Sequence, residues 1–328
     1  MKRNDQSTSY LWPFATMVFL FFVVGFLTTA NMQFQTPLKE AFLSGAGKLK
    51  NSLTLLITFS WFVAYPVFGW IGGKWVSSKG YQHAMTRGLA LMTIGVSLFV
   101  LSAASTSWNL SANSPLPIGY FIFLLGSFLT GGAATVLQVV INPYLVACDI
   151  PHTQAVQRMA IGGSSNAIGT VIAPYFVAAI AFNNVSIQDV NIGQVLTPYA
   201  VLAIVILATT LLFSRFHLPD MANTHANEEE RLNASVWAFK RFRLGVVAIF
   251  CYVGCEVCVG GNINLYVVQD LKGSVSDVAG MATAYWALML LGRLMGSALR
   301  TVSPRVQLSI ATTAATTLIV LGIALQEP

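Results

Sequence analysis

Charged residues are scarce in this chain. They make up 9% of its 328 residues, while hydrophobic residues make up 55% and the mean hydropathy is +0.67. A soluble domain carries about 25% charged residues, so this shortage excludes a soluble fold. The net charge of +6 comes from short basic clusters between apolar runs, not from one continuous basic face. We therefore expect a membrane protein that has no nucleic-acid partner.

Cysteine and histidine are also rare, which bears on disulfides, metals and catalysis. Three of the four cysteines, Cys251, Cys255 and Cys258, share one helix face, and Cys148 ends another apolar run. We expect all four to be reduced, buried packing residues. The predicted spans contain no histidine that could complete a metal site, and we find no nucleotide-binding loop, catalytic triad or zinc motif. The sequence thus predicts no enzyme and no cofactor.

Apolar runs of membrane length recur along the chain. About 20 apolar residues cross a hydrocarbon core of about 30 Å. The first run continues into a polar segment without a small-residue cleavage pattern, so we interpret it as an uncleaved first helix. The sequence predicts an all-α membrane protein with about nine transmembrane helices. The predicted spans are 11–30, 53–71, 84–104, 118–147, 160–182, 199–213, 244–266, 278–299 and 306–325.

The basic residues indicate the orientation of these spans. Fourteen of the 18 lysines and arginines fall on the same side as the N-terminus. The other four are Lys39, Lys48, Lys50 and Lys272. Because cytoplasmic loops carry an excess of basic residues, this asymmetry predicts a cytoplasmic N-terminus.

The most polar stretch, residues 215–243, separates six predicted spans from three. We interpret it as a solvated cytoplasmic linker. Residues 1–214 would then form an N-terminal bundle of six helices, and residues 244–328 an incomplete C-terminal bundle of three. Many transporters are built from two similar bundles.

A weak internal repeat supports this division. The pattern Phe-x-x-Val-Gly begins at Phe21 in the first span and again at Phe250 in the seventh. The seventh span would then open a second bundle, and the chain would end at Pro328, three helices before that bundle is complete.

Two amides, Gln138 and Asn142, lie one helical turn apart in the fourth span. Residues at i and i+4 share a helix face, and Pro143 frees a backbone carbonyl one turn back. The hydrocarbon core of a membrane tolerates neither unpaired amides nor an unpaired carbonyl. This face must therefore meet other helices or a water-filled cavity. Amides can simply join membrane helices by hydrogen bonds. They also suit a neutral polyhydroxylated solute, and the pair indicates a path for a sugar-like molecule.

Glu256 is the only carboxylate well inside a predicted span. Burial of an unpaired glutamate favours its protonated form. One interpretation is that Glu256 loads and releases a proton as water access alternates. The other is that it forms an interhelical hydrogen bond or ion pair that fixes packing.

The last three spans contain other residues with two interpretations each. Asn262 and Asn264 point to different helix faces, so at most one of them lines the same cavity. Trp286 can stack on a sugar or pack against a neighbouring helix. Arg293 either extends to the membrane interface or pairs across a gate.

Spaced motifs link these features to a known family. In chain order they are FFVVGFLTTAN at 21–31, LQVVINPY at 137–144, Arg158, Asn166, Gly169 and Pro174 in the fifth span, YVGCEV at 252–257, and Tyr285-Trp286 with Gly292-Arg293-x-x-Gly296-Ser297 in the eighth. Together they resemble the fucose–galactose–glucose:proton symporter family of the major facilitator superfamily. The resemblance covers nearly the whole chain.

The resemblance implies a secondary transporter of a neutral hexose such as glucose, galactose or fucose. It implies proton symport by alternating access between two bundles. The expected setting is a monomer in the cytoplasmic (inner) membrane of a bacterium. Glu256 is the candidate for proton coupling and Arg293 for gating. The candidate sugar contacts are Gln138, Asn142, Asn31, Asn166 and Trp286.

The chain departs from the family pattern at several polar positions. Asn31 is followed by Met32, where relatives carry an aspartate that fucose-type members use in proton coupling. Gln138 stands where fucose-type members have a glutamate, as it does in glucose/galactose-like members. Ala160 and Gly163 stand where the family has asparagine and glutamine. These changes and the nine spans motivate an alternative, a non-transporting remnant or a membrane sugar sensor.

Overall fold

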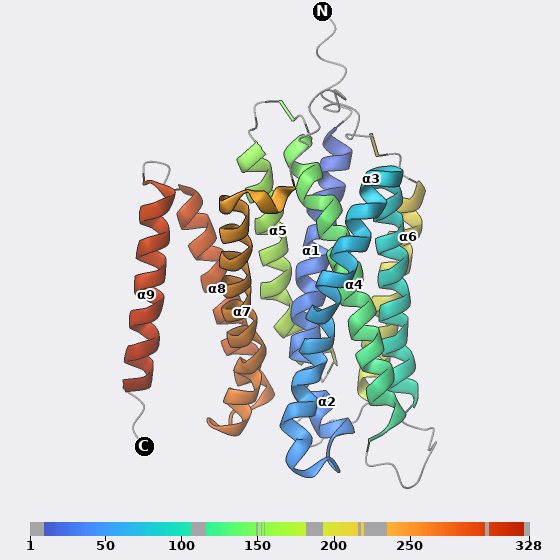
Figure 1. Ribbon diagram of the computed structural model, residues 1–328. Helices are drawn as coiled ribbons and strands as arrows, with labels where there is room; N and C mark the ends of the chain where they lie inside the picture. Colours follow the sequence, from blue (N-terminus) through green and yellow to red (C-terminus); the bar gives the residue numbers. More distant parts are fainter. Residues whose placement is uncertain are drawn as a thin grey trace, which may run out of the picture. The chain divides into compact units, whose positions relative to one another are not determined.

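The computed structural model describes residues 10–105, 116–148, 150–151, 153, 155–181, 193–215, 218–219, 235–298 and 302–324. These residues are overwhelmingly helical, which confirms the predicted all-α membrane class (Figure 1). The long helices are α1 (Leu11–Gln33), α3 (Lys50–Ala104), α4 (Ile118–Ala147), α5 (Ala155–Phe176), α6 (Gly193–Arg215), α7 (Lys240–Gln269), α8 (Val275–Ala298) and α9 (Pro304–Ala324). The shorter elements are α2 (Gln35–Phe42), η1 (Gly47–Leu49), the π-helical turn η3 (Val177–Ala181) and η6 (Val236–Ala238).

The chain forms two compact units. The first, Met1–Ala287, contains α1 to α7 and the first half of α8. The second, Leu288–Pro328, contains the rest of α8 and α9. The predicted linker 215–243 falls largely on positions outside the described residues, so the proposed division into two bundles stays a prediction.

Helix α3 combines two predicted spans. At about 1.5 Å per residue, its 55 residues would extend about 80 Å, far beyond a hydrocarbon core of about 30 Å. The helix is interrupted at Gly80, whose φ of 80° and ψ of 172° are not helical. Such a positive φ suits glycine, which has no Cβ. Figure 1 shows the result, a blue arm and a teal arm that run in opposite directions.

Among the described residues, seven helical segments are long and apolar enough to cross a membrane. They are α1, α3 with η1, α4, α6, α7, and the central parts of α8 and α9. Predicted spans two and three both lie in α3, and the fifth, in α5, is not among the seven. Helix α5 contains the polar and small run Gly-Gly-Ser-Ser-Asn at 162–166, which lowers its apolar character. A multi-pass protein is confirmed, and the count of nine stays a prediction.

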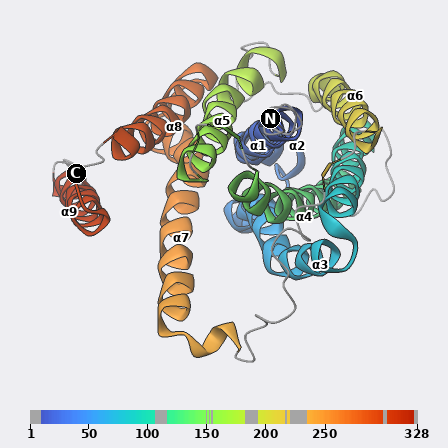
Figure 2. The ribbon, with the colours of Figure 1, turned by 90° about the horizontal axis from the view of Figure 1, so that it is seen from above.

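The core of the first unit lies where α3, α4, α1 and α5 pack together. The most extensive contacts join α3 to α4, followed by α1 to α5 and α3 to α6. Figure 2 shows α1 between α4, α5 and α6. Small residues allow the close approaches. A Cβ at Gly25 of α1 would meet the backbone of Asn166, and one at Gly169 of α5 would lie 2.8 Å from the backbone nitrogen of Phe26.

A buried arginine holds the end of α4 against the start of α5. Arg158 donates hydrogen bonds to the carbonyl oxygens of Leu145 (2.9 Å) and Val146 (2.7 Å) in α4. It also donates to the carbonyl oxygen (3.0 Å) and the hydroxyl (3.1 Å) of Thr153. These carbonyls belong to the last turn of α4 and the loop after it. A cation is favourable there because it meets the negative end of the helix dipole.

Candidate functional site

The first unit contains six of the seven predicted site residues, on five helices. Asn31 lies on α1, Asn166 on α5 and Glu256 on α7. Gln138 and Asn142 lie on α4, and Trp286 lies on α8. Arg293 lies in the second unit, where it is exposed, and its gating role stays a prediction.

Gln138 contacts a tyrosine that the sequence did not single out. Its Nε2 donates to the hydroxyl of Tyr65 on α3 at 3.4 Å. Thr28 of α1 and Trp61 of α3 also lie beside that hydroxyl. Tyr65 directly precedes Pro66 in an apolar run, and this position is the one sequence signal that could have marked it. The phenol of Tyr65 thus lies among polar groups of α1, α3 and α4.

Glu256 lies on the side of α7 that faces these groups. It is half-buried, and its carboxylate is close enough to Tyr65 and Tyr285 to interact electrostatically with both phenols. The Tyr285 hydroxyl donates to the backbone carbonyl of Glu256 at 3.1 Å. Glu256 is therefore within electrostatic range of the phenol that Gln138 contacts, Tyr65.

Asn31 belongs to a second group of polar side chains, toward the end of α1. The hydroxyl of Ser127 on α4 donates to Asn31 Oδ1 and to the carbonyl of Ile57 on α3, both at 3.1 Å. Asn264 of α7 donates from Nδ2 to the carbonyl of Met32 at 3.2 Å. We call Asn31, Ser127 and Asn264 the amide cluster.

A third polar contact lies near the amide cluster. Gln35 of α2 donates to the hydroxyl of Thr58, the residue after Ile57 on α3. A Cβ at Gly261 of α7 would lie 3.9 Å from the Thr58 methyl group. The start of α2 and the second half of α7 therefore both pack near this part of α3.

Several buried polar atoms in this region have no hydrogen-bond partner within the described part of the chain. On α1 and α2 they are Thr29 Oγ1, Asn31 Nδ2, Gln33 Nε2 and Gln35 Oε1. Trp61 Nε1, Asn142 Oδ1, Asn264 Oδ1 and Trp286 Nε1 share this property. Leaving such a group unsatisfied costs about 1–3 kcal/mol, and native structures pair most of them. These atoms are the candidates on these helices for hydrogen bonds to a polar solute.

Asn166 and Trp286 make packing contacts. Asn166 Nδ2 donates to the carbonyl of Phe21 at 2.9 Å and so ties α5 to α1. Trp286 is 3% exposed, and its ring would lie 2.8 Å from a Cβ at Gly260 of α7. It also meets the ring of Tyr285 edge-on, with 4.9 Å between the centroids. Direct sugar contact by either residue stays a prediction.

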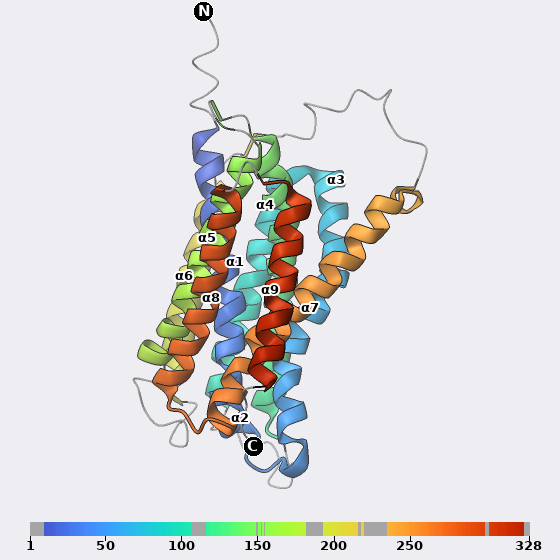
Figure 3. The same ribbon diagram turned by 90° about the vertical axis from the view of Figure 1, so that its left-hand side faces the viewer.

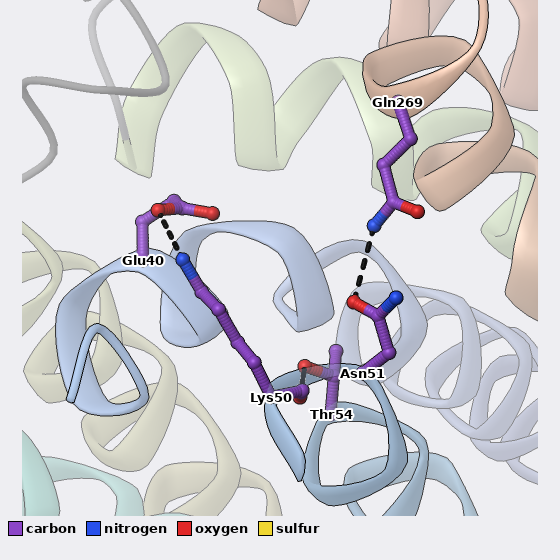
Figure 4. A network of polar contacts seen from close by, with 5 residues as sticks. All are labelled: Glu40, Lys50, Asn51, Thr54 and Gln269. Carbon is purple, nitrogen blue, oxygen red and sulfur yellow. Dashed lines mark hydrogen bonds and ion pairs between the residues drawn. The ribbon is translucent and has the colours of Figure 1, made fainter. Parts of the chain in front are cut away.

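The end of α7 carries a polar network, which Figure 4 shows. Gln269 Nε2 donates to Asn51 Oδ1 at 3.2 Å, and Lys50 Nζ forms an ion pair with Glu40 at 2.8 Å. Burial lowers the pKa of the neighbouring Lys39, while Glu40 opposes the shift and Lys50 adds to it. The network links the end of α7, the helix that also carries Asn264, to the start of α3.

The cysteines differ from expectation. None of the four, all of them described residues, forms a disulfide, and Cys148 is buried as predicted. Cys251, Cys255 and Cys258 are exposed, so the prediction of burial is wrong for them. They lie on the side of α7 away from its buried face, which carries Gly260 and Asn264. Within the described residues, no group of three or more His, Cys, Asp and Glu residues could hold a metal ion.

The site therefore combines amides, hydroxyls and aromatic rings with one carboxylate. The fold of the chain defines the class of protein. The chain superposes with a TM-score of 0.64 on a major facilitator superfamily transporter, FucP, in the outward conformation. The two share 22% sequence identity, and the match covers 89% of this chain and 72% of that one. The protein has the fold of a major facilitator transporter.

Sequence comparison finds curated relatives that are sugar transporters. The chain is 27% identical over 300 residues to the glucose/galactose transporter of Brucella abortus biovar 1 (strain 9-941), covering 90% of this chain and 68% of the relative. It is 23% identical over 319 residues to the L-fucose-proton symporter of Escherichia coli (strain K12), covering 90% and 69%. No family model matches the chain. The chain is a homologue of these transporters, which are not enzymes, and the resemblance in its motifs is confirmed.

Proposed function

We propose that the protein transports a neutral hexose by alternating access. The observation that carries this proposal is a set of uncharged amides on α1, α4 and α7: Asn31, Asn142 and Asn264 each have a buried atom without a hydrogen-bond partner among the described residues. The homology to a glucose/galactose transporter and to an L-fucose-proton symporter supports a sugar as the solute.

The chemistry of the site suits such a solute. A hexose presents several hydroxyls, each of which donates and accepts hydrogen bonds. Gln138, Asn142 and Asn31 supply amide groups from α4 and α1, and the site would bind without a net charge. Tyr65 orients the Gln138 amide through its hydroxyl. Gln138 is the residue for which we expect the largest loss of sugar affinity.

Proton coupling by Glu256 is the second part of the proposal. Met32 occupies the position after Asn31, so the first helix supplies no carboxylate there. Glu256 interacts electrostatically with Tyr65, which contacts Gln138, and this arrangement supports a link between protonation and sugar binding. Glu256→Gln should retain sugar exchange but lose accumulation driven by a pH gradient. Unchanged gradient-driven accumulation in that variant would reject Glu256 as the proton carrier.

We also propose a bacterial inner-membrane setting with a cytoplasmic N-terminus. The support is the excess of basic residues on the N-terminal side of the predicted spans. Cysteine-free protein with single cysteines at Lys48 or Arg241 would test it. Under this topology an impermeant maleimide labels the first position in intact cells and the second only after permeabilisation.

Uptake into proteoliposomes tests the main proposal. The full chain is reconstituted, and uptake of labelled D-glucose, D-galactose and L-fucose is measured with and without an inward proton gradient. We expect saturable uptake of at least one hexose and a large loss in Gln138→Leu. Binding without uptake would favour the sugar-sensor alternative, and neither binding nor uptake would overturn a sugar-related function.

A further inference from the structure

Helix α7 has a narrow buried face, and an asparagine is its polar member. Its buried residues are Gly260, Gly261, Asn264 and Val267. Asn264 is 0% exposed, although most of the first half of the helix is exposed. Figure 3 shows α7 inclined to α1, so that the two helices approach each other over a short stretch. A polar residue at the contact point of two membrane helices needs hydrogen-bond partners there.

One half of the Asn264 amide is used within the protein. Its Nδ2 donates to the carbonyl of Met32 at 3.2 Å, which fixes the orientation of the amide because a carbonyl only accepts. Gly261 lies against Thr58, and Gly260 lies against the ring of Trp286. These glycines, about one turn before Asn264, let α7 pack closely against α8 and contact α3.

The other half of the amide has no such partner. Asn264 Oδ1 is buried and finds no hydrogen-bond donor in the described part of the chain. Within the described helices, Asn31, the residue before Met32, has an unpaired donor where Asn264 has an unpaired acceptor. Its Oδ1 accepts from Ser127, while its buried Nδ2 has no acceptor among the described residues. The same stretch of α1 therefore has a spare donor of its own and a spare acceptor from α7.

We propose that Asn264 is a solute-binding residue of α7 and that its Oδ1 accepts a hydrogen bond from a hydroxyl of the bound hexose. Asn31 Nδ2 donates to the same hydroxyl or to its neighbour, because a hydroxyl both donates and accepts. This inference rests on the proposed function and deepens it. Asn31 of α1 supplies the spare donor, and Asn264 supplies the spare acceptor from α7.

The geometry also couples binding to the contact between α1 and α7. The Asn264 amide donates from its nitrogen to the Met32 carbonyl and, in this proposal, accepts from the sugar at its oxygen. A bound hydroxyl therefore favours the arrangement in which α7 lies against α1. A solute without that hydroxyl leaves the buried oxygen unpaired and loses affinity.

The chain offers a matched control on the same helix. Asn262 lies two residues before Asn264, and its Nδ2 donates to the Cys258 carbonyl of its own helix at 2.7 Å. Asn262→Ala removes an amide of the same size from α7 without touching α1. Its effect on sugar binding should be small.

Equilibrium binding with deoxy sugars tests the proposal. The purified full chain is titrated with D-glucose, D-galactose, L-fucose and the monodeoxy analogues of the hexose that binds best. In the unsubstituted protein we expect one analogue to bind about tenfold more weakly than its parent. In Asn264→Ala the parent should bind about tenfold more weakly, and that analogue should lose nothing further. Asn262→Ala should keep the affinities and the discrimination of the unsubstituted protein.

Three outcomes overturn the inference, and they are separable from a failure of the proposed function. Equal weakening of every sugar in Asn264→Ala would mean that the residue only links α7 to α1. Unchanged affinity in that variant, or no discrimination among deoxy sugars by the unsubstituted protein, would also overturn it. If Asn264→Ala does not yield monodisperse protein, Asn264→Ser replaces it. Absence of all hexose binding in the unsubstituted protein would instead reject the proposed function itself.

Discussion

Helices α4 and α7 are alike in sequence character and differ in burial. Each has 30 residues and is long and apolar enough to cross a membrane, yet the most apolar window is 67% buried in α4 and 11% buried in α7. Glycines of the two helices have different surroundings. A Cβ at Gly126 of α4 would lie 2.9 Å from the Gly95 carbonyl, whereas one at Gly254 of α7 would have nothing within 4 Å. Apolarity places a helix in the membrane, and small residues facing other backbones place it within the bundle.

The largest loss of stability should come from disrupting such a close helix contact in α4. A Cβ at Gly131 would meet the backbone of Trp61 on α3, including its carbonyl oxygen. Because backbone cannot move aside like a flexible side chain, Gly131→Ala should destabilise the protein by about 3 kcal/mol. The melting temperature in detergent, monitored by size-exclusion chromatography of heated samples, measures this loss. A melting temperature equal to that of the unsubstituted protein would contradict close packing of α4 on α3.

The next largest loss of stability is expected at the end of α4. Arg158 makes four hydrogen bonds to backbone and hydroxyl oxygens of Leu145, Val146 and Thr153. Arg158→Met keeps much of the side-chain volume but leaves buried carbonyls without a donor, so we expect a loss of about 2 kcal/mol. Arg243→Met is the control, because Arg243 is exposed on α7 and surface changes usually stay within about 0.5 kcal/mol. Equal melting temperatures for the two variants would remove the contrast between the helices.

The sequence predicted the helices better than their partners. Runs of membrane length marked every long helix, because burial in lipid requires an apolar segment of a given length. The two arms of α3 match two separately predicted spans, and the break between them lies at Gly80, whose backbone is not helical. The exposure of Cys251 depends on which helices flank α7, and this information lies far away in the chain.

The same limit applies to the candidate site. The spacing of Gln138 and Asn142 identified a polar face, since i and i+4 positions share a helix face. Tyr65, which Gln138 contacts, lies 73 residues away from it in sequence, and only the packing of α3 on α4 brings the two together. For Asn262 and Asn264, spacing showed that their faces differ. It could not show that Asn264 is the one facing α1.

A smaller effect separates packing from binding at Asn166. Its amide donates to the Phe21 carbonyl, next to the close approach of Gly25 and the Asn166 backbone. Asn166→Ala should therefore cost about 1 kcal/mol of stability, the worth of one buried hydrogen bond. If the residue only packs, discrimination among deoxy sugars should be unchanged in this variant. A selective loss for one hydroxyl would instead show that Asn166 contacts the solute.

The smallest effect is expected at Gly254 of α7, the counterpart of Gly131. Its surroundings hold no heavy atom within 4 Å of an added Cβ, and the residue sits inside a regular helix. Alanine there removes backbone freedom from the unfolded chain without a clash, so Gly254→Ala should leave stability unchanged or raise it by about 0.5 kcal/mol. The melting temperature is compared directly with that of Gly131→Ala. A loss as large as that at Gly131 would mean that α7 is packed as closely as α4 in the membrane, because only a neighbouring backbone makes an added methyl group so costly.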